Sequence, residues 1–407
     1  MDNKAYFKNI TTLFKGSSIS QLMPILASPL LTKIYTPDEF GEFSKFLSLV
    51  LILVPLGTLK YDQALLLPRD QKGLERLVSL IILTLIGVTT SLTVILFLNF
   101  HFDFYKLDFW ILVPVVFLAI NLNLVIEQIA VRLTMFVKTS ISISLRSALN
   151  VIFQISLGFN KLGVIGLIIS NIIGALASFL FILKSLKQKL FHINLLKIND
   201  LKNIAKKYIR FPIYILPSEI FASVSNNFLP IILASKFSLE NVGYFYLTTK
   251  IIGLPTTIVG RSISQVFYSK ISENYRTNKK SLNLNLLKNT FFKLVIFLVP
   301  IAGLLYIMID FVIVTIFGED WISTSVFLKI LAPFYFIKLV SSSFSSVLII
   351  YKKQRIELAT NILLFALTIL TFIFSNSFEM FLSFYSLALS GVYISLMFFY
   401  YYTLKND

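Results

Sequence analysis

The chain of 407 residues has no cysteine, only two histidines and few charged residues, and each shortage excludes a class of chemistry. Without cysteine there are no disulfides, no thiolate nucleophiles and no cysteine-bound metals. His101 and His192 both fall between expected helices, which argues against a histidine-built metal site or proton relay inside a membrane. Charged residues make up 14% of the chain, whereas 56% is hydrophobic and the mean hydropathy is +0.81. This balance is typical of an integral membrane protein.

Enzyme motifs are also absent from the sequence. We find no Walker-type phosphate loop, no His-Glu-x-x-His and no Gly-x-Ser-x-Gly. A paired-aspartate metal site, which a membrane glycosyltransferase would use, is missing as well, and so is the large outer loop that a polymerase would need. We therefore expect a protein that is not an enzyme and has no cofactor. If transport needs a driving ion, H⁺ and Na⁺ are the candidates.

Apolar runs of about 20 residues, long enough to cross about 30 Å of hydrocarbon, recur along the whole chain. The N-terminal segment is basic but lacks a short apolar core with a cleavage site, so we expect it to be retained. The expected fold class is an all-α integral membrane protein. We expect twelve spanning helices, at 13–34, 41–60, 77–99, 109–127, 141–159, 163–184, 211–234, 242–262, 291–316, 325–350, 356–375 and 379–402.

The net charge of +17 is distributed unevenly between the two ends of these helices. If the N-terminus is cytoplasmic, the cytoplasmic segments hold 29 of the 37 lysines and arginines. The opposite loops, such as "TPDEFGE" and "GEDWIS", are short and acidic. Basic residues are retained on the cytoplasmic side of a membrane. We therefore expect a multi-pass protein with both termini cytoplasmic, and the positive charge needs no nucleic-acid partner to account for it.

Two turns in the sequence resemble each other, "TKIYTPDEFGEFS" and "SKFSLENVGYFYL". Aligning Gly41 with Gly243 pairs Thr36 with Ser238 and brings the first loop of each half into register. A polar linker at about 184–210 separates six expected helices from six. We predict two six-helix bundles, 1–198 and 199–407, that form a parallel repeat of the kind found in transporters. The alternative is that turns of this composition are simply common.

Charged residues inside apolar spans are expensive and therefore mark cavities or partners. The basic ones are Lys45, Lys250 and Lys338, and the repeat alignment places Lys45 about one helical turn from the position of Lys250. Lys45 is near a helix end, where extending its charge to the interface is an equal alternative. Glu219 is a candidate for ion coupling or for a pair with a lysine. Asp310 is close enough to a helix end for a solvated position.

The first and seventh expected helices combine prolines with amides and hydroxyls. We expect bends at Pro24, Pro29, Pro217 and Pro230, because proline removes a backbone donor. Amide side chains that face lipid find no hydrogen-bond partners, so we expect a hydrated central cleft lined by Gln21, Asn226 and Asn227. The alternative is ordinary packing between helices through small and amide residues.

The stretches "QLMPILASPLLTKIYTPDEFGEF" and "VGYFYLTTKIIGLPTTIVGRSISQVFYSKISE" resemble polysaccharide and O-antigen repeat-unit flippases of the multidrug/oligosaccharidyl-lipid/polysaccharide exporter superfamily. The resemblance implies a V-shaped pair of six-helix bundles in the bacterial cytoplasmic (inner) membrane. It implies transport of undecaprenyl-diphosphate-linked oligosaccharides for O-antigen or capsule, beside the glycan polymerase and export machinery. The family has a basic residue where this chain has Lys250. The alternatives are a cation-coupled multidrug exporter of the same superfamily and, more remotely, a membrane glycosyltransferase or polymerase.

The charge asymmetry leads to a prediction about topology. Reporters of the outer compartment fused after Asp103 or Asp320 should be active, whereas the same reporters fused after Lys405 should be silent. Paired reporters with opposite compartment requirements provide the measurement. Activity at the cytoplasmic face after Asp103 or Asp320 would reject this orientation.

Overall fold

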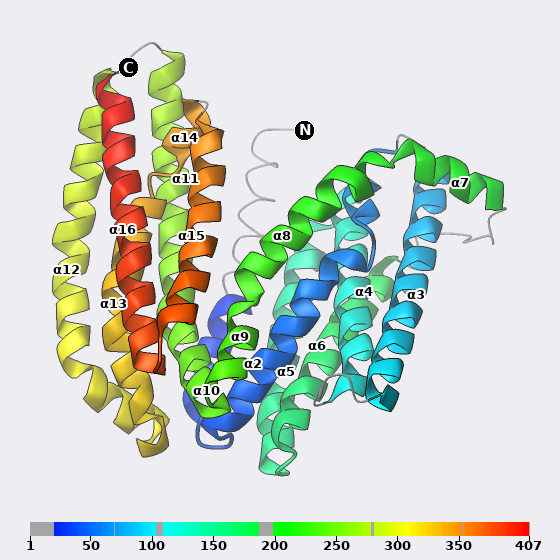
Figure 1. Cartoon of the computed structure of the whole chain (residues 1–407). Coiled ribbons are helices and arrows are strands. Elements are labelled where there is room, and N and C mark those ends of the chain that lie inside the picture. The colour runs from blue at the N-terminus through cyan, green and yellow to red at the C-terminus, as the bar shows by residue number, and fades with distance from the viewer. Residues whose placement is uncertain are drawn as a thin grey trace. The chain divides into compact units, whose positions relative to one another are not determined.

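The computed structural model describes residues 20–68, 70–102, 109–186, 198–277, 281–351 and 353–406, which are helical almost throughout and contain no strand (Figure 1). Eight helical segments in this part of the chain are long and apolar enough to cross a membrane. The protein is thus an all-α membrane protein, as the sequence predicted. The eight are α3 (Gln71–Phe102), α4 (Val113–Arg132), α5 (Phe136–Phe159), α6 (Gly163–Leu186), α12 (Ser281–Phe317), α13 (Ile322–Ser342) continued by α14 (Ser346–Ile350), α15 (Gln354–Phe374) and α16 (Phe378–Lys405).

The other four expected spans are shorter or interrupted. The first is described as a helix only over Ser20–Leu31, and residues 13–19 lie outside the described part. The second ends early, because Pro55 follows α2 (Pro37–Leu53) and the chain continues through 3-10 turns η1 (Val54–Leu56) and η2 (Tyr61–Leu66). The seventh consists of a π-helical turn η4 (Phe211–Ile215), α8 (Leu216–Asn227) and α9 (Leu229–Lys236). The eighth consists of α10 (Leu239–Thr248), a π-helical turn η5 (Thr249–Gly253) and α11 (Leu254–Arg276).

The chain packs as two compact units, Met1–Lys236 and Phe237–Asp407. Part of the expected linker, residues 187–197 with His192, lies outside the described residues, as does Asp103. The remainder of the linker forms α7 (Ile198–Lys207), which packs against α3. Arg76 pairs with Asp200 at 3.8 Å, and Ile204 is buried in the core. The described end of the linker therefore belongs to the first unit, while the predicted repeat of two six-helix bundles stays a proposal.

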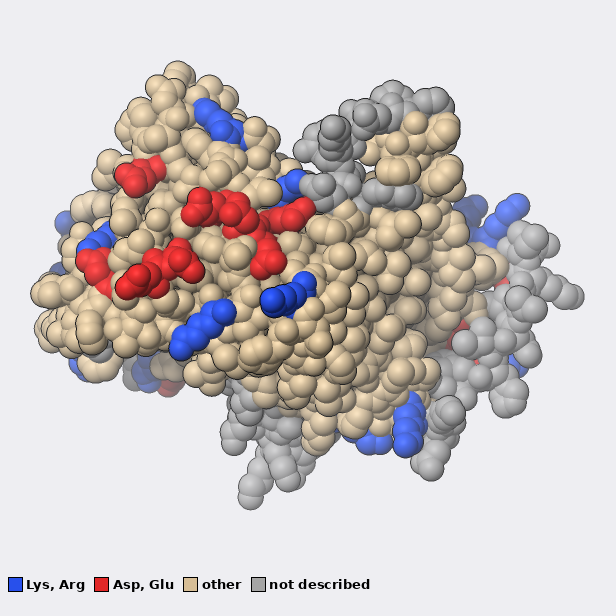
Figure 2. Space-filling model, turned by 90° about the horizontal axis from the view of Figure 1, so that it is seen from below, with Lys and Arg blue, Asp and Glu red and all other residues tan. Residues whose placement is uncertain are grey.

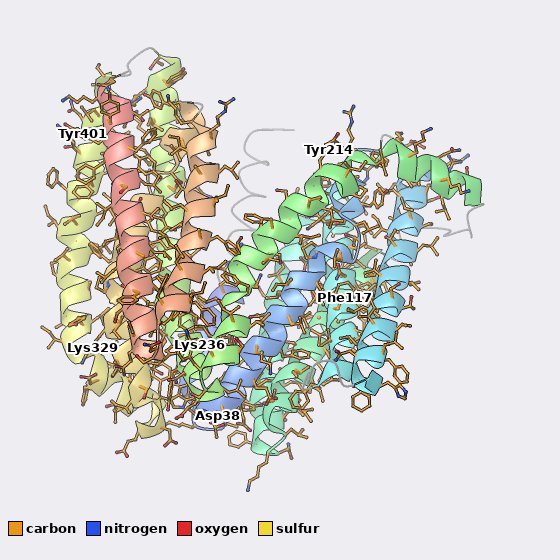
Figure 3. All side chains as sticks on the ribbon, in the orientation of Figure 1. Asp38, Phe117, Tyr214, Lys236, Lys329 and Tyr401 are labelled. Carbon is orange, nitrogen blue, oxygen red and sulfur yellow. The ribbon has the colours of Figure 1, made fainter. Side chains whose placement is uncertain are left out.

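Polar side chains and small residues connect α4, α5 and α6 in the first unit. The Asn123 amide donates to the Ala175 carbonyl and accepts a hydrogen bond from Ser178 Oγ at 2.9 Å. A Cβ on Gly174 would lie 2.7 Å from the Arg146 carbonyl oxygen, so only glycine allows α5 and α6 to approach this closely. Phe117 of α4 is fully buried (Figure 3). Small residues and buried amides are the usual means of helix association in membranes.

The second unit is built around aromatic and aliphatic side chains of α11, α13, α14 and α16. Phe267 and Phe344 meet edge to face at 4.9 Å, and Phe334 contacts Tyr385 and Tyr393. Aromatic pairs of this geometry contribute beyond their buried area. The α12 helix stays at the margin of this core, and its side chains are mostly exposed.

The two similar turns found in the sequence adopt the same local structure. Thr36 and Ser238 are the N-caps of α2 and α10, both in extended conformation, and each side chain accepts a hydrogen bond from the backbone N–H of the third residue of its helix, Glu39 or Asn241. The aromatic residue before each cap contacts two later helices of its own unit. Tyr35 packs between α5 and α6 and donates to the Gln154 carbonyl at 2.6 Å, while Phe237 contacts Phe372 of α15 and Phe378 of α16.

The Tyr35 hydroxyl is held in its protonated form. Burial, together with the Glu39 carboxylate, raises the pKa of Tyr35 to about 12. The hydroxyl therefore remains a donor to the Gln154 carbonyl throughout the neutral pH range.

Acidic side chains occupy the helix ends at which α2 and α10 begin. Asp38 and Glu39 lie in the first turn of α2, Glu240 in that of α10, and Glu319 and Asp320 precede α13. Figure 2 shows several acidic side chains, in red, gathered on the face seen from below. Carboxylates are favourable at helix N-termini. In each unit the structure thus agrees with the acidic loops that the sequence places at one end.

Gly158 is predicted to be irreplaceable, since a Cβ there would lie 2.4 Å from Ile34 Cγ2 and 2.7 Å from Tyr35 Cζ. Gly158→Ala should destabilise the protein by about 1–3 kcal/mol, because the turn must shift to make room. The control is Gly87→Ala in α3, where the new methyl group meets no atom within 4 Å. Thermal unfolding of the detergent-solubilised proteins provides the measurement, and equal melting temperatures for the two variants would contradict the close approach.

Candidate substrate-binding site

Lys250 lies in the π-helical turn η5, in the middle of the eighth expected span. Pro255 follows closely, and since proline has no N–H the regular hydrogen-bond ladder cannot continue through this point. A π-helical turn accommodates such a break and is frequent at functional sites. Lys250 is half-buried, and its Nζ lies 4.3 Å from the centre of the Tyr246 ring. The ring face partly offsets the cost of placing this charge among apolar helices.

Lys338 of α13 faces a small polar cavity, which we name the hydroxyl pocket. The pocket has a volume of about 230 Å³ and is lined by Thr256, Thr257, Gly260, Ser264, Lys338, Leu339, Ser342 and Ser345. Thr256 and Thr257 both donate to the Gly253 carbonyl, at 2.9 and 2.8 Å. Lys338 Nζ lies near the rings of Phe334 and Tyr335, and it takes part in none of the ion pairs formed by the described residues. The pocket therefore combines a cation with hydroxyl groups.

The two lysines lie on adjoining helices of the second unit. A Cβ on Gly253 would lie 3.3 Å from Tyr335, and one on Gly260 would lie 3.2 Å from Ser342. Both pairs differ by 82 in residue number (335 − 253 and 342 − 260), so α11 and α13 run in the same direction and Lys338 lies level with Thr256. At a rise of 1.5 Å per residue, the six positions from Lys250 to that level correspond to about 9 Å along the helix axis.

The other predicted cleft residues belong to the first unit. Lys45 is half-buried on α2 and Gln21 is half-buried in the helix Ser20–Leu31. On α8, Asn226 is exposed, and the Asn227 amide donates to the Ser223 carbonyl at 2.9 Å. The structure thus groups Lys250 with Lys338 and assigns the three amides and Lys45 to the other unit. The role of these residues in binding stays a prediction.

The prolines expected at helix bends occupy two kinds of position. Pro24 and Pro29 lie inside the helix Ser20–Leu31. Pro217 and Pro230 are instead second residues of α8 and α9, where the missing N–H leaves no intrahelical bond unmade. In the seventh span the chain is therefore divided into successive short helices.

Glu219, the candidate for ion coupling, has partners at the end of α2. Its Oε2 lies 3.5 Å from Lys60 Nζ, and its Oε1 accepts a hydrogen bond from Gln63 Nε2 at 3.4 Å. The Lys60 side chain is 13% exposed and that of Glu219 is 41% exposed. Lys60 adopts a left-handed conformation with φ of 61°, which turns the chain between α2 and η2. The carboxylate is thus reachable by water but balanced by a lysine.

Sequence reasoning missed several charged contacts. The early end of α2 brings Lys60 to Glu219. Glu127 of α4 and Arg146 of α5 lie 3.7 Å apart and connect the two helices. Asp310 of α12 pairs with Lys329 of α13. Apolar runs interrupted by one charge were the available signal, but the partner of each charge depends on tertiary contact.

The fold defines the class of protein. The structure is similar to an inward-facing multidrug resistance MATE family transporter of the MOP superfamily, with a TM-score of 0.66 and 16% identity over 97% of this chain and 99% of that one. It is similar to the lipid II flippase MurJ in an inward closed conformation, with a TM-score of 0.72 and 16% identity over 97% and 87% of the two chains. It is also similar to a MOP superfamily transporter from Pyrococcus furiosus, with a TM-score of 0.55 and 14% identity over 98% of this chain and 94% of that one. The chain thus has the fold of MOP superfamily transporters and flippases.

The sequence itself assigns the family within that class. The family described as polysaccharide biosynthesis protein matches residues 30–326. The chain belongs to this family, which confirms the resemblance found in the sequence. No curated protein matches the chain.

The pair between Lys60 and Glu219 leads to a prediction about stability. Lys60→Met and Glu219→Gln should each lower stability, and the double variant should lose less than the sum, with a coupling energy of about 0.5–1 kcal/mol. The control is the exposed pair Lys270 and Glu273, both 55% exposed, for which the coupling should be smaller. Double-mutant cycles on the purified protein provide the measurement. Additive effects of the first two substitutions would show that the pair contributes nothing.

Proposed function

We propose that this protein is a flippase that moves undecaprenyl-diphosphate-linked oligosaccharide repeat units from the inner to the outer leaflet of the bacterial cytoplasmic membrane. Transport proceeds by alternating access and is coupled to an ion. The diphosphate and sugar cannot cross hydrocarbon unaided, whereas the polyprenyl tail remains in lipid. The product serves O-antigen, capsule or a related glycan and passes to the glycan polymerase and export machinery. Family membership supports the link to polysaccharide synthesis.

The observation that carries this proposal is the grouping of Lys250 and Lys338 on η5 and α13. A lysine among apolar helices has a desolvation cost that an anionic ligand offsets. Lys338 also lines a pocket with hydroxyl groups. Those of Thr256, Thr257 and Ser342 donate to backbone carbonyls, so their lone pairs are able to accept hydrogen bonds from a sugar. Lysine has a long flexible stem, so two lysines whose backbone positions lie about 9 Å apart along the helix axis are able to converge on one diphosphate.

The alternative functions fit these residues less well. A multidrug exporter for organic cations would be expected to present carboxylates to its substrate, and the hydroxyl pocket contains none. A membrane glycosyltransferase or polymerase needs acidic residues around a metal, and no cluster of three or more metal-ligating side chains occurs in the described ranges. Genes for glycosyltransferases and a separate polymerase beside this one would favour the flippase.

Glu219 is the residue we assign to ion coupling. Its carboxylate is 41% exposed and shares its charge with Lys60, so a proton or Na⁺ arriving at Glu219 would release the lysine. Exchange of partners at a carboxylate is an economical means of linking an ion to a change of conformation. Lys45, Gln21, Asn226 and Asn227 are assigned to sugar and diphosphate contacts from the first unit.

The test is complementation of a deletion strain. The strain should lose its surface glycan and accumulate lipid-linked repeat units on the cytoplasmic side. Wild type should restore the glycan, Lys250→Arg should restore most of it, Lys250→Ala should lose about tenfold or more in rate, and Lys250→Glu should be worst because it repels the diphosphate.

The matched control is Lys288→Ala. Lys288 also lies near an aromatic ring, that of Tyr401 at 5.5 Å, but it is exposed on α12. It should support full transport. If Lys250→Ala is folded, present at the normal level and fully active, Lys250 does not bind the substrate.

A further inference from the structure

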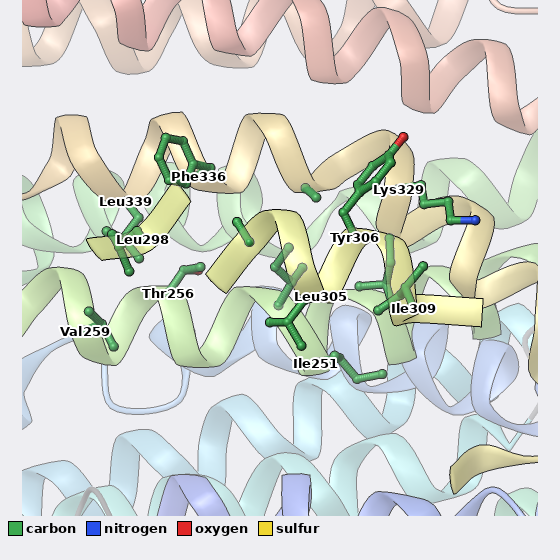
Figure 4. A pocket seen from close by; sticks show the side chains of 14 residues that line it. Ile251, Thr256, Val259, Leu298, Leu305, Tyr306, Ile309, Lys329, Phe336 and Leu339 are labelled. Carbon is green, nitrogen blue, oxygen red and sulfur yellow. The ribbon is translucent and has the colours of Figure 1, made fainter. Parts of the chain in front are cut away.

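A long apolar groove crosses the second unit beside the hydroxyl pocket. It lies between α11, α12 and α13 and has a volume of about 370 Å³. We name it the α11–α13 groove. In Figure 4, Ile251 of η5 and Val259 of α11 form one wall, and Phe336 and Leu339 of α13 form the opposite one. The size is that of a ligand pocket rather than of a packing defect.

Each of the three helices contributes one continuous stripe to the groove. From α13 the lining residues are 328, 332, 336 and 339 with the adjoining 329, and from α12 they are 298, 302, 305 and 309 with the adjoining 306. These spacings of three and four residues define one face of each helix. The eleven steps from Leu328 to Leu339 make the groove about 16 Å long. It therefore suits an extended chain lying parallel to the helices.

The groove opens at the margin of the unit. Leu305 lines it and is nevertheless 52% exposed, and Ile307 on the outer side of α12 is 80% exposed. Because α12 is a membrane-spanning helix, the surroundings of these side chains are hydrocarbon. The occupant must therefore be a chain that comes from the bilayer.

The two ends of the groove differ in charge. At one end Lys329 is neutralised by Asp310, which also accepts a hydrogen bond from Ser325 at 2.6 Å. At the other end Thr256 and Leu339 line both the groove and the hydroxyl pocket, so the two cavities adjoin there. Lys338 lines that pocket and, unlike Lys329, takes part in none of the ion pairs of the described residues. The two ends therefore favour an occupant whose anionic group lies at the Lys338 end.

We propose that the α11–α13 groove holds the isoprenoid chain of a polyprenyl phosphate lipid and that Lys338 binds the phosphate. This assignment rests on the proposed function and names the part of the substrate that unit Phe237–Asp407 holds. The small side chains of Ala302 and Ala332 leave room for the methyl branches of an isoprenoid, and the rings of Tyr306 and Phe336 pack against flat trisubstituted double bonds. A straight acyl chain needs neither feature.

The experiment measures binding of undecaprenyl monophosphate to the full-length protein in detergent by native mass spectrometry, with phosphatidylglycerol as the competing lipid. Ala332→Trp should fill the groove, and Lys338→Met should remove the charge at its end. Each should weaken binding of the polyprenyl phosphate by about tenfold or more, and phosphatidylglycerol should compete poorly. The matched control is Ala366→Trp, because Ala366 is exposed on α15 and does not line the groove.

Ala302→Trp on the opposite wall is a second groove variant, and thermal unfolding identifies any variant that fails to fold. Unchanged binding in folded Ala332→Trp and Ala302→Trp would overturn the proposal. The proposal would also be overturned if wild type bound phosphatidylglycerol as tightly as undecaprenyl monophosphate and both variants lost that binding. That result would identify the groove as an ordinary lipid site.

Complementation separates this proposal from the proposed function. If the deletion strain keeps its glycan while polyprenyl phosphate binding follows the predicted pattern, the proposed function fails alone. If the strain loses its glycan but Ala332→Trp binds and complements like wild type, the groove assignment fails alone.

Discussion

Hydrocarbon offers no hydrogen-bond partners, and at two departures from a regular helix in the described part of this protein the chain supplies them itself. Where α2 ends at Pro55, the Asp62 carboxylate accepts from Thr58, and Arg132 donates to the carbonyls of Leu65 and Pro68. Where α10 gives way to η5, Thr256 and Thr257 donate to the Gly253 carbonyl. The polar groups that make the interruptions tolerable are thus the same groups that give the chain polar sites.

The interruptions and the charged residues coincide for this reason. Lys60, Glu219 and Lys250 all lie in or beside a break in the second, seventh or eighth expected span, while α4, α5 and α6 form a regular and tightly packed scaffold. In that scaffold, buried amides such as Asn123 hydrogen-bond between helices and hold them together. Polar residues of α4, α5 and α6 are therefore mainly structural, whereas the residues to which we assign substrate binding include Lys250 at a break and Lys338 on α13.

Apolar length made the regular helices predictable. The expected span 163–184 is α6 (Gly163–Leu186), and 77–99 lies within α3 (Gln71–Phe102). The equivalent caps Thr36 and Ser238 were also visible, since they depend on local sequence. The π-helical turns could not be predicted, because a proline predicts a break but not its geometry. The contact between Gln63 and Glu219 could not be predicted either, because the two residues are 156 apart in the chain. The α11–α13 groove exists only once three helices are placed together.

The π-helical turn η5 has a consequence for how the protein is made. A lysine at the centre of a spanning helix opposes insertion by about 2.5–3.5 kcal/mol, and the segment from α10 to α11 carries Lys250 together with this irregular turn. The Tyr246 ring in the same span partly offsets the lysine, but Tyr335, which packs against Gly253 of this turn, belongs to α13, and α13 leaves the ribosome later. Stable insertion of the eighth span therefore depends on helices synthesised after it, and biogenesis of the second unit is cooperative rather than strictly sequential.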